Sequence, residues 1–316
     1  MQFLPKRSLS IILTDLAVWI VAMAIFVVLR FSPVFSGPVI AVAKSDIPFK
    51  FYLYFGLQIG VFLGIVYGIV DLFLDQNWLR RRSYGSILII KGVIHFVVLI
   101  LISVLIRVEA FDQFDIELNR ENLRNSLINP GLIIILGYTT MVSFVLNFFR
   151  QINLKFGPGN LWKFITGRFH HPKEEERIFM FLDMKGSTTI AESLGHVQFG
   201  ELVQDCFSDL SVVRNNEAEV YQYVGDEAIL YWEVDKGLRN NNCLQAFFEY
   251  NQLLQSKSEY YQKTYGVIPE FKAGANIGAV TVTEVGDIKR DLAFLGDTMN
   301  TAARIESECN KHNTHL

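Results

Sequence analysis

Four long apolar segments in the N-terminal half constrain this chain more than any other feature. Each approaches the roughly 20 residues that a helix needs to cross the hydrocarbon core of a bilayer. The first segment follows two basic residues, as a signal peptide would. Its apolar run is too long for a signal peptide and no small-residue cleavage site follows, so it is interpreted as a retained span. The predicted spans are Leu9–Leu29, Phe51–Val70, Tyr84–Ile106 and Pro130–Phe149.

Basic residues flank these spans unevenly, and the positive-inside rule then places both termini in the cytoplasm. We therefore predict an integral protein of the bacterial inner membrane, with four spans in the lipid bilayer. The basic side carries Lys6, Arg7, Arg80–Arg82, Arg150, Lys155, Lys163 and Arg168. The opposite side carries Pro33, Pro38, Pro48, Glu109, Asp112, Asp115, Glu117 and Glu121, with Arg120 and Arg124 as exceptions.

Three ionisable residues, Asp15, Lys91 and His95, lie within the predicted spans. Charge in a bilayer is costly and usually faces the interior of a helix bundle. Two interpretations are open, a site that senses a signal and an interhelical polar contact that fixes packing. Haem held between spans would normally need a pair of histidines, and His95 is the one that these spans offer.

Charge, cysteine content and hydropathy bound the remaining choices. A net charge of −3 argues against broad nucleic-acid binding, which needs a clustered basic surface. The three cysteines are far apart and form no C-x-x-C pair, so reduced thiols are expected. The apolar excess lies in the N-terminal half. We predict a transmembrane domain at 1–150, a cytoplasmic linker at 151–176 and a soluble domain at 177–316.

The linker is polar and basic, and its glycine and proline residues mark a domain boundary. A short helix is expected within Asn160–Phe169. The segments Gly157-Pro158-Gly159 and His170-His171-Pro172 lie on either side of it.

Hydrophobic periodicity predicts an α/β sandwich in the soluble half, with helices covering one face of a largely antiparallel sheet. A hairpin is expected at Gly225, between two short strand-like runs. The predicted strands are Arg177–Met184, Ala218–Val224, Ala228–Val234, Phe271–Thr283 and Asp291–Leu295. The predicted helices are Ser187–Asn215, Leu238–Tyr265 and Thr298–Cys309.

Two acidic residues are set apart by their positions at strand ends. Asp183 closes the first predicted strand, and Asp226 lies at the tip of the hairpin. Neighbouring strands lie about 5 Å apart, so two such carboxylates can share divalent cations. The alternatives are a helix cap for Asp183 and an ordinary turn residue for Asp226.

Two further segments fit a phosphate-bearing substrate. The turn Gly186-Ser187-Thr188 brings free backbone N–H groups to a helix N-terminus, where anions bind. Asn300 and Arg304 are four residues apart on a predicted helix and project from the same face. Arginine supplies a planar charged fork for phosphate, and asparagine can orient a sugar oxygen. The alternative for Arg304 is an exposed ion pair with Glu308.

Taken together, the segments FLDMKGST, YVGDEAIL and GDTMNTAARIE resemble, in this order, the class III adenylate and guanylate cyclase family. The resemblance covers about Arg177 to Leu316. It implies a ferredoxin-like, palm-type α+β domain behind the four-helix transmembrane bundle, working as a head-to-tail homodimer. It also implies that Asp183 and Asp226 hold two Mg²⁺ or Mn²⁺ ions, while Asn300 and Arg304 of the other protomer complete the site.

The resemblance further implies cyclisation of a purine nucleoside triphosphate. The ribose 3′-OH attacks the α-phosphate and pyrophosphate leaves. Adenine-selective members carry Lys and Asp where this chain has Gln222 and Ala293. Gln222 can donate and accept hydrogen bonds, whereas the Ala293 side chain can do neither. The Glu and Cys of guanylate cyclases are absent too, and ATP is the favoured substrate.

Family domains continue beyond the Asn/Arg helix into strands that usually supply a lysine, whereas this sequence stops at Leu316. A fragment of a longer chain is the favoured explanation, and an incomplete, inactive domain is the alternative. Three rival functions are therefore kept. They are a catalytically inactive regulatory or dimerisation module, a guanylate cyclase and a diguanylate cyclase. The last needs a second glycine where Val224 stands.

Overall fold

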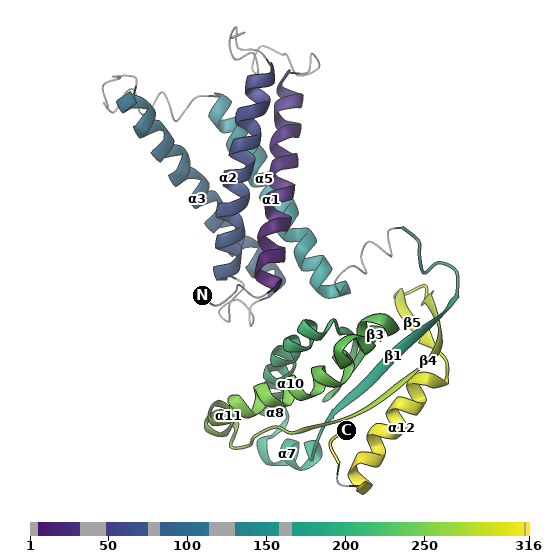
Figure 1. Ribbon diagram of the computed structural model, residues 1–316. Coiled ribbons are helices and arrows are strands. Elements are labelled where there is room, and N and C mark those ends of the chain that lie inside the picture. The colour runs from purple at the N-terminus through teal and green to yellow at the C-terminus, as the bar shows by residue number, and fades with distance from the viewer. Residues whose placement is uncertain (1–5, 32–48, 75–82, 114–129, 158–165, 313) are drawn as a thin grey trace. The chain divides into compact units, whose positions relative to one another are not determined.

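The computed structural model describes residues 6–31, 49–74, 83–113, 130–157, 166–312 and 314–316. It divides into two compact units, Met1–Ile152 and Asn153–Leu316, which are treated separately below (Figure 1). Several predictions concern residues outside the described ranges, among them the helix at 160–165 and most of the flanking residues used for orientation. Of the predicted linker helix, residues 166–169 are described, and they form a turn.

Within the described residues, the N-terminal unit contains four helices that are long and apolar enough to cross a membrane, as the sequence predicted. Apolar side chains dominate their outward surfaces, as lipid requires. The helices are α1 (Lys6–Phe31), α2 (Phe49–Leu74), α3 (Tyr84–Gln113) and α5 (Pro130–Phe156).

Helices α1 and α2 pack closely along a stripe of four glycines on α2, spaced four residues apart. A Cβ atom at Gly60 would lie 2.9 Å from the Cα of Ile20, and one at Gly64 would lie 2.6 Å from the Cα of Leu16. Small residues at such spacing let two helix backbones approach each other in a membrane. The stripe consists of Gly56, Gly60, Gly64 and Gly68.

Five ionisable residues meet inside the helical unit, four of them buried and Arg150 partly exposed. The Arg150 guanidinium on α5 donates to both Asp15 on α1 and Asp71 on α2. Lys91 Nζ on α3 lies 3.1 Å from Asp71 Oδ1, and His95 Nε2 lies 3.5 Å from the same oxygen. We call these five residues the membrane ion cluster. Because all four helices contribute to it, the geometry fits an interhelical contact that fixes packing.

The C-terminal unit confirms the predicted strands and divides two predicted helices. The long helix after the first strand stops at Gly195, whose φ of 74° and ψ of 162° are not helical. The second predicted helix breaks at Lys257. The elements of the C-terminal unit are β1 (Lys173–Met184), α7 (Ser187–Leu194), α8 (His196–Asp209), η2 (Leu210–Asn216), β2 (Glu219–Val224), β3 (Glu227–Glu233), α9 (Val234–Leu238), η3 (Arg239–Asn241), α10 (Asn242–Ser256), α11 (Ser258–Tyr265), β4 (Phe271–Val285), β5 (Asp291–Leu295) and α12 (Asp297–His312).

The five strands form one antiparallel sheet in the order β2-β3-β1-β4-β5. The central strand β1 pairs with β3 on one side and with β4 along its whole length on the other. Its C-terminal end therefore lies between two strands, with Leu182 opposite Ala228 and Asp183 opposite Lys272. This register decides which side chains surround Asp183.

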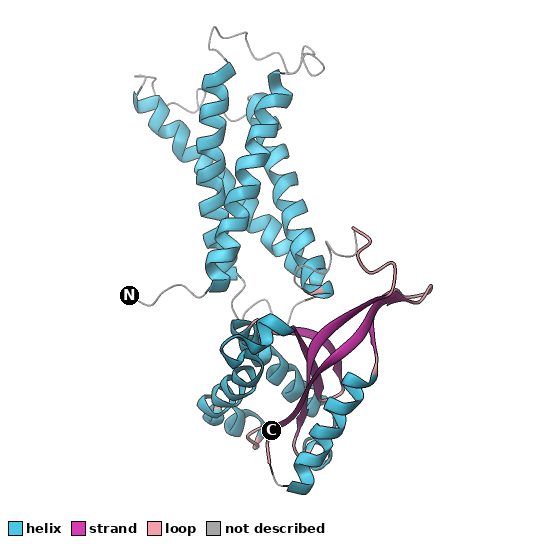
Figure 2. Cartoon of the chain, turned by 45° about the vertical axis from the view of Figure 1, so that its right-hand side comes forward, coloured by secondary structure: helices cyan, strands magenta, loops and turns pink. Residues whose placement is uncertain are grey.

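Helices cover both faces of the sheet, and the prediction that they cover one face is wrong (Figure 2). Met180 and Leu182 of β1 point into the core beneath α8 and α10. Phe179 and Phe181 point to the other face, where Ala302 of α12 packs on them. Central β1 is buried on both sides, so its run of apolar residues does not alternate with polar ones.

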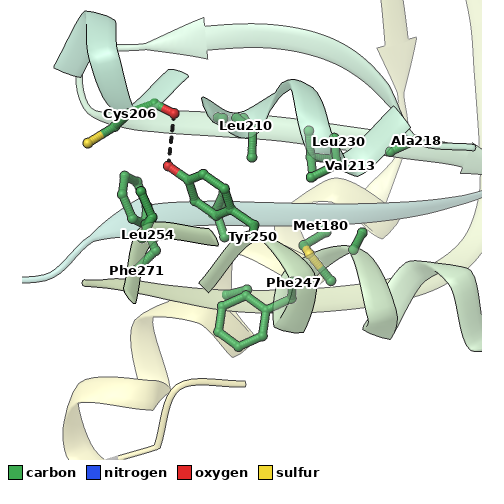
Figure 3. Packing of buried hydrophobic residues seen from close by; sticks show 14 of the residues in the cluster. Met180, Cys206, Leu210, Val213, Ala218, Leu230, Phe247, Tyr250, Leu254 and Phe271 are labelled. Atoms are coloured by element: carbon green, nitrogen blue, oxygen red, sulfur yellow. Dashed lines mark hydrogen bonds between the residues drawn. The ribbon is translucent and has the colours of Figure 1, made fainter. Parts of the chain in front are cut away.

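The larger core lies between the sheet and helices α8 and α10, and Figure 3 shows its packing. There the Tyr250 hydroxyl donates to the backbone carbonyl of Cys206 at 3.2 Å. Buried polar groups of this kind usually find a partner, because an unmet hydrogen bond is costly. Cys206, Cys243 and Cys309 are all buried and free, as reduced thiols would be.

Candidate active site

Asp183 lies next to the last residue of β1, half-buried on the face of the sheet that α12 covers. It does not cap the following helix. Gly186, with φ of 65°, is the N-cap of α7, and no side chain hydrogen-bonds there. The Asp183 carboxylate instead contacts Lys272 of β4, whose Nζ lies 3.1 Å from Oδ2. The helix-cap alternative is therefore excluded.

Asp226 occupies the second position of the two-residue turn between β2 and β3. The turn is closed by the pair Val224 and Glu227, and Gly225 before Asp226 has φ of 62°. A positive φ at the first turn position is typical of a type II′ hairpin, where glycine is favoured. The Asp226 Oδ2 atom is buried and has no hydrogen-bond partner among the described residues. An ordinary turn aspartate would satisfy that oxygen locally.

The two aspartates lie within each other's electrostatic field. Burial raises the pKa of the Asp183 carboxyl, the hydrogen bond from Lys272 opposes this, and the charge of Asp226 raises it further. Burial likewise raises the pKa of Glu227 to about 7, helped by the charges of Asp183 and Glu306. Crowded carboxylates of this kind are common at functional sites, where a cation completes the charge balance.

Lys272 and Glu306 belong to the same group of charges, although the sequence analysis did not select them. Lys272 is 6% exposed, and its ammonium lies 2.6 Å from Glu306 Oε1 on α12. A lysine within the otherwise apolar strand Phe271–Ala275 was the available signal, because charge is rarely buried without a partner. We call these residues the strand-edge cluster. Its members are Asp183, Asp226, Glu227, Lys272 and Glu306.

The turn Gly186-Ser187-Thr188 follows Asp183 directly and opens α7. The glycine carbonyl accepts from the Ile190 N–H at 3.0 Å, so the first helical turn is formed. Without a capping side chain, the earlier backbone N–H groups remain available to an anion. Ser187 is half-buried and Thr188 is exposed.

Asn300 and Arg304 lie on the exposed side of α12, while Thr298, Ala302 and Glu306 face the sheet. Their side chains therefore lie apart from the buried strand-edge cluster of the same chain. Glu308, the alternative partner of Arg304, pairs with Lys311 at 2.6 Å instead. These two residues are presented to solvent, where another molecule can meet them.

The two candidate base-reading positions lie on different edge strands. Gln222 is exposed on β2, just after a register irregularity in the pairing with β3. Such irregularities re-aim side chains and are frequent beside active sites. Ala293 is half-buried on β5 opposite Thr283. The structure brings neither residue into the strand-edge cluster.

The strand-edge carboxylates fit a hard divalent cation. Carboxylate oxygens are the ligands that Mg²⁺ and Mn²⁺ prefer, and the buried Asp226 Oδ2 lacks any other partner among the described residues. No group of three or more His, Cys, Asp or Glu side chains with metal-ligand geometry occurs in the described part of the chain. An ion held by Asp183 and Asp226 would need further ligands, and substrate phosphates commonly supply them.

Residues 170–316 match the family model described as the adenylate and guanylate cyclase catalytic domain. The C-terminal part of the chain is therefore similar to the class III adenylate and guanylate cyclase catalytic domain, and four apolar helices precede it.

Among individual relatives, the chain is 29% identical over 198 residues to adenylate cyclase 2 of Rhizobium meliloti strain 1021. The match covers 62% of this chain and 54% of that protein, so the chain spans about half the length of this curated relative. It includes more residues than the C-terminal unit contains, so the likeness extends into the helical unit.

Solved structures that match this chain include both kinds of cyclase. A bacterial light-regulated adenylyl cyclase is 20% identical, with a TM-score of 0.48, over 56% of this chain and 53% of that one. The guanylyl cyclase Cya2 is 18% identical, with a TM-score of 0.40, over 43% of this chain and 71% of that one.

Proposed function

We propose that this chain is a membrane-anchored adenylate cyclase that converts ATP to 3′,5′-cyclic AMP and pyrophosphate as a homodimer with shared sites. One observation carries the proposal. Asp183 of β1 and Asp226 of the β2–β3 turn lie close enough for each other's charge to matter, and Asp226 Oδ2 is buried without a hydrogen-bond partner among the described residues. That arrangement suits a family whose members act on nucleoside triphosphates with divalent ions.

Asp183 and Asp226 would hold two Mg²⁺ or Mn²⁺ ions per site. Divalent ions bound there would lower the pKa of the ribose 3′-OH and offset the charge of the phosphates. The uncapped start of α7, at Gly186-Ser187-Thr188, would bind phosphate oxygens through backbone N–H groups. In the reaction the 3′-oxygen forms a bond to the α-phosphorus, the bond to the bridging β-phosphate oxygen breaks, and pyrophosphate leaves.

The exposed positions of Asn300 and Arg304 support a site shared between two subunits. Both side chains face solvent, on the side of α12 away from the sheet, whereas Asp183 lies under that helix. Asn300 and Arg304 of the partner subunit would orient the ribose and stabilise charge on the α-phosphate. Most of the catalytic effect then comes from positioning and preorganised charge, so a monomer would be nearly inactive.

ATP is preferred to GTP as the proposed substrate. The relative at 29% identity is named an adenylate cyclase. Gln222 is exposed beside the hairpin and can both donate to and accept from a purine edge. Ala293 offers no hydrogen bond from its side chain, so discrimination between the two purines should be incomplete.

The four apolar helices would anchor the domain in the bacterial inner membrane, with both termini on the cytoplasmic side. The helices have the length and composition to span. Cytoplasmic placement would give the site access to ATP, which agrees with the basic residues flanking the spans.

The proposal is tested with the full chain in detergent or in membranes, incubated with ATP or GTP and Mn²⁺, with cyclic nucleotide measured by mass spectrometry. Cyclic AMP should form from ATP, and cyclic GMP should form more slowly from GTP. Asp183→Ala should abolish both activities. Equal formation of product by this variant would remove the proposed function.

The shared site is tested by mixing inactive variants. Asp226→Asn and Arg304→Ala should each be inactive alone, and co-expression should restore part of the activity, because one hybrid interface regains every group. The matched control combines Asp183→Ala with Asp226→Asn, in which both hybrid sites remain defective. Recovery in the control, or none in the test pair, would contradict the shared arrangement.

A further inference from the structure

Lys272 places a buried positive charge against one of the proposed metal-binding carboxylates. It lies on β4 directly opposite Asp183 of β1 in the strand register. Its ammonium is 3.1 Å from Asp183 Oδ2 and 2.6 Å from Glu306 Oε1, and the lysine side chain is 7% exposed. One ammonium therefore bridges a proposed metal ligand and a carboxylate on another element.

Glu306 is brought to this position by an unusually close approach of α12 to the sheet. A Cβ atom at Gly274 would lie 2.1 Å from the backbone nitrogen of Glu306 and 2.5 Å from the carbonyl oxygen of Ala302. Glycine is therefore required there, and it fixes the height of the Glu306 carboxylate above β4. The helix carries Arg304 on its exposed side, two residues earlier.

The ammonium competes with a divalent cation for Asp183. A buried lysine is costly unless paired, so Lys272 has to remain close to carboxylate oxygens. The two salt bridges stabilise the ammonium form of Lys272, and one of them directs its charge at Asp183.

We propose that Lys272 and Glu306 are positioning residues that set the divalent-cation affinity of Asp183. The Lys272 ammonium balances the charge of Asp183 while no cation is bound. Glu306, at the shorter distance, holds the ammonium and limits its competition once a cation occupies the site. This inference rests on the proposed function, because it assigns Asp183 to a cation.

The test uses Mn²⁺ and the full chain in detergent without nucleotide, with free Mn²⁺ measured from its paramagnetic resonance signal. Glu306→Gln should weaken Asp183-dependent binding about 10-fold, as loss of outer-shell partners typically does. Lys272→Gln should change the affinity in the opposite direction and tighten binding. A purely structural role would weaken binding in both variants, and that result would overturn the inference.

Three further variants keep the test decisive if one protein folds poorly. Lys272→Arg retains the charge and should bind Mn²⁺ as the wild type does. The double variant Lys272→Gln/Glu306→Gln removes both charges and should return most of the affinity. Lys257→Gln removes an ammonium from Asp209, 2.6 Å away in another part of the domain, and should leave Mn²⁺ affinity unchanged.

The outcomes separate this inference from the proposed function. If Lys272→Gln and Glu306→Gln change the Mn²⁺ affinity in opposite directions but the wild type has no cyclase activity, the positioning role stands and the proposed function is wrong. If both variants weaken Mn²⁺ binding and the wild type is an active cyclase, the proposed function stands and the positioning role is wrong. Binding that is absent in the wild type, or that persists in Asp183→Ala, would overturn both the cation site and the roles of Lys272 and Glu306.

Discussion

The two units of this protein each bury a group of charges, and the two groups are composed differently. In the membrane ion cluster, two carboxylates meet the basic side chains of Lys91 and Arg150, beside His95. In the strand-edge cluster, four carboxylates influence one another around the single ammonium of Lys272. The first group is balanced by the chain itself, whereas the second carries excess negative charge.

The difference separates a structural ion cluster from a site prepared for a ligand. Balanced charges from four helices hold a bundle together, because separating them in an apolar medium is costly. Unbalanced carboxylates raise one another's pKa and are relieved when a divalent cation binds. Breaking the first cluster should therefore destabilise the protein, while neutralising one carboxylate of the second should stabilise it.

The largest effect is expected for Asp71→Asn in the membrane ion cluster. The variant leaves Lys91 and Arg150 without one shared carboxylate, and breaking a buried pair of this kind costs about 3–5 kcal/mol. Thermal unfolding of the full chain in detergent, followed by helical circular dichroism, should show a lower midpoint. Asp291→Asn, which removes an exposed pair with Lys289, is the control and should leave the midpoint unchanged. An equal effect in both would mean that the cluster does not hold the helices.

A smaller effect of opposite sign is expected for Asp226→Asn. Removing one of the crowded charges should stabilise the strand edge by ~1 kcal/mol when divalent ions are absent, as is common at functional sites. Hydrogen exchange of β1 and β3 in the full chain should become slower. Mn²⁺ should protect these strands in the wild type and not in the variant. Faster exchange in the variant would show that the carboxylates do not repel one another.

The smallest effect concerns the pH dependence of Glu227. Its pKa is raised from 4.5 to about 7, so the folded state binds more protons than the unfolded state between these values. Stability should therefore fall as pH rises across this window, by on the order of 0.5–1 kcal/mol after solvent screening of a half-exposed group. Glu227→Gln should flatten the profile of hydrogen exchange measured between pH 5 and 8. If the pH dependence of hydrogen exchange is the same in Glu227→Gln as in the wild type, groups other than Glu227 cause it.

Much of the site follows from local sequence, since strand ends and turns are short-range features. The apolar run before Asp183 and the glycine before Asp226 were sufficient to place both aspartates at strand ends. Two helices were predicted without interruption, but the structure breaks them at Gly195 and Lys257. The prediction missed both breaks because an amphipathic stripe continues across a short break. Glycine with a positive φ ended the first helix there.

Other features required long-range information. The spacing of Gly56, Gly60, Gly64 and Gly68 was visible, but their partner helix α1 was not. Asp71 and Arg150 lay at the ends of apolar segments, and only packing shows that one guanidinium joins α1, α2 and α5. Lys272 was an isolated charge in a strand until the register placed it opposite Asp183.

The sequence by itself determined the four long apolar helices, the strand-helix pattern of the C-terminal unit and the resemblance of that unit to class III cyclases. These depend on composition and on periodicity within single elements. Only the tertiary structure decided that α12 covers the second face of the sheet, and that Lys272 and Glu306 adjoin the proposed metal site. The reason is that strand register and helix contacts join residues far apart in the chain, and no local pattern records those partners.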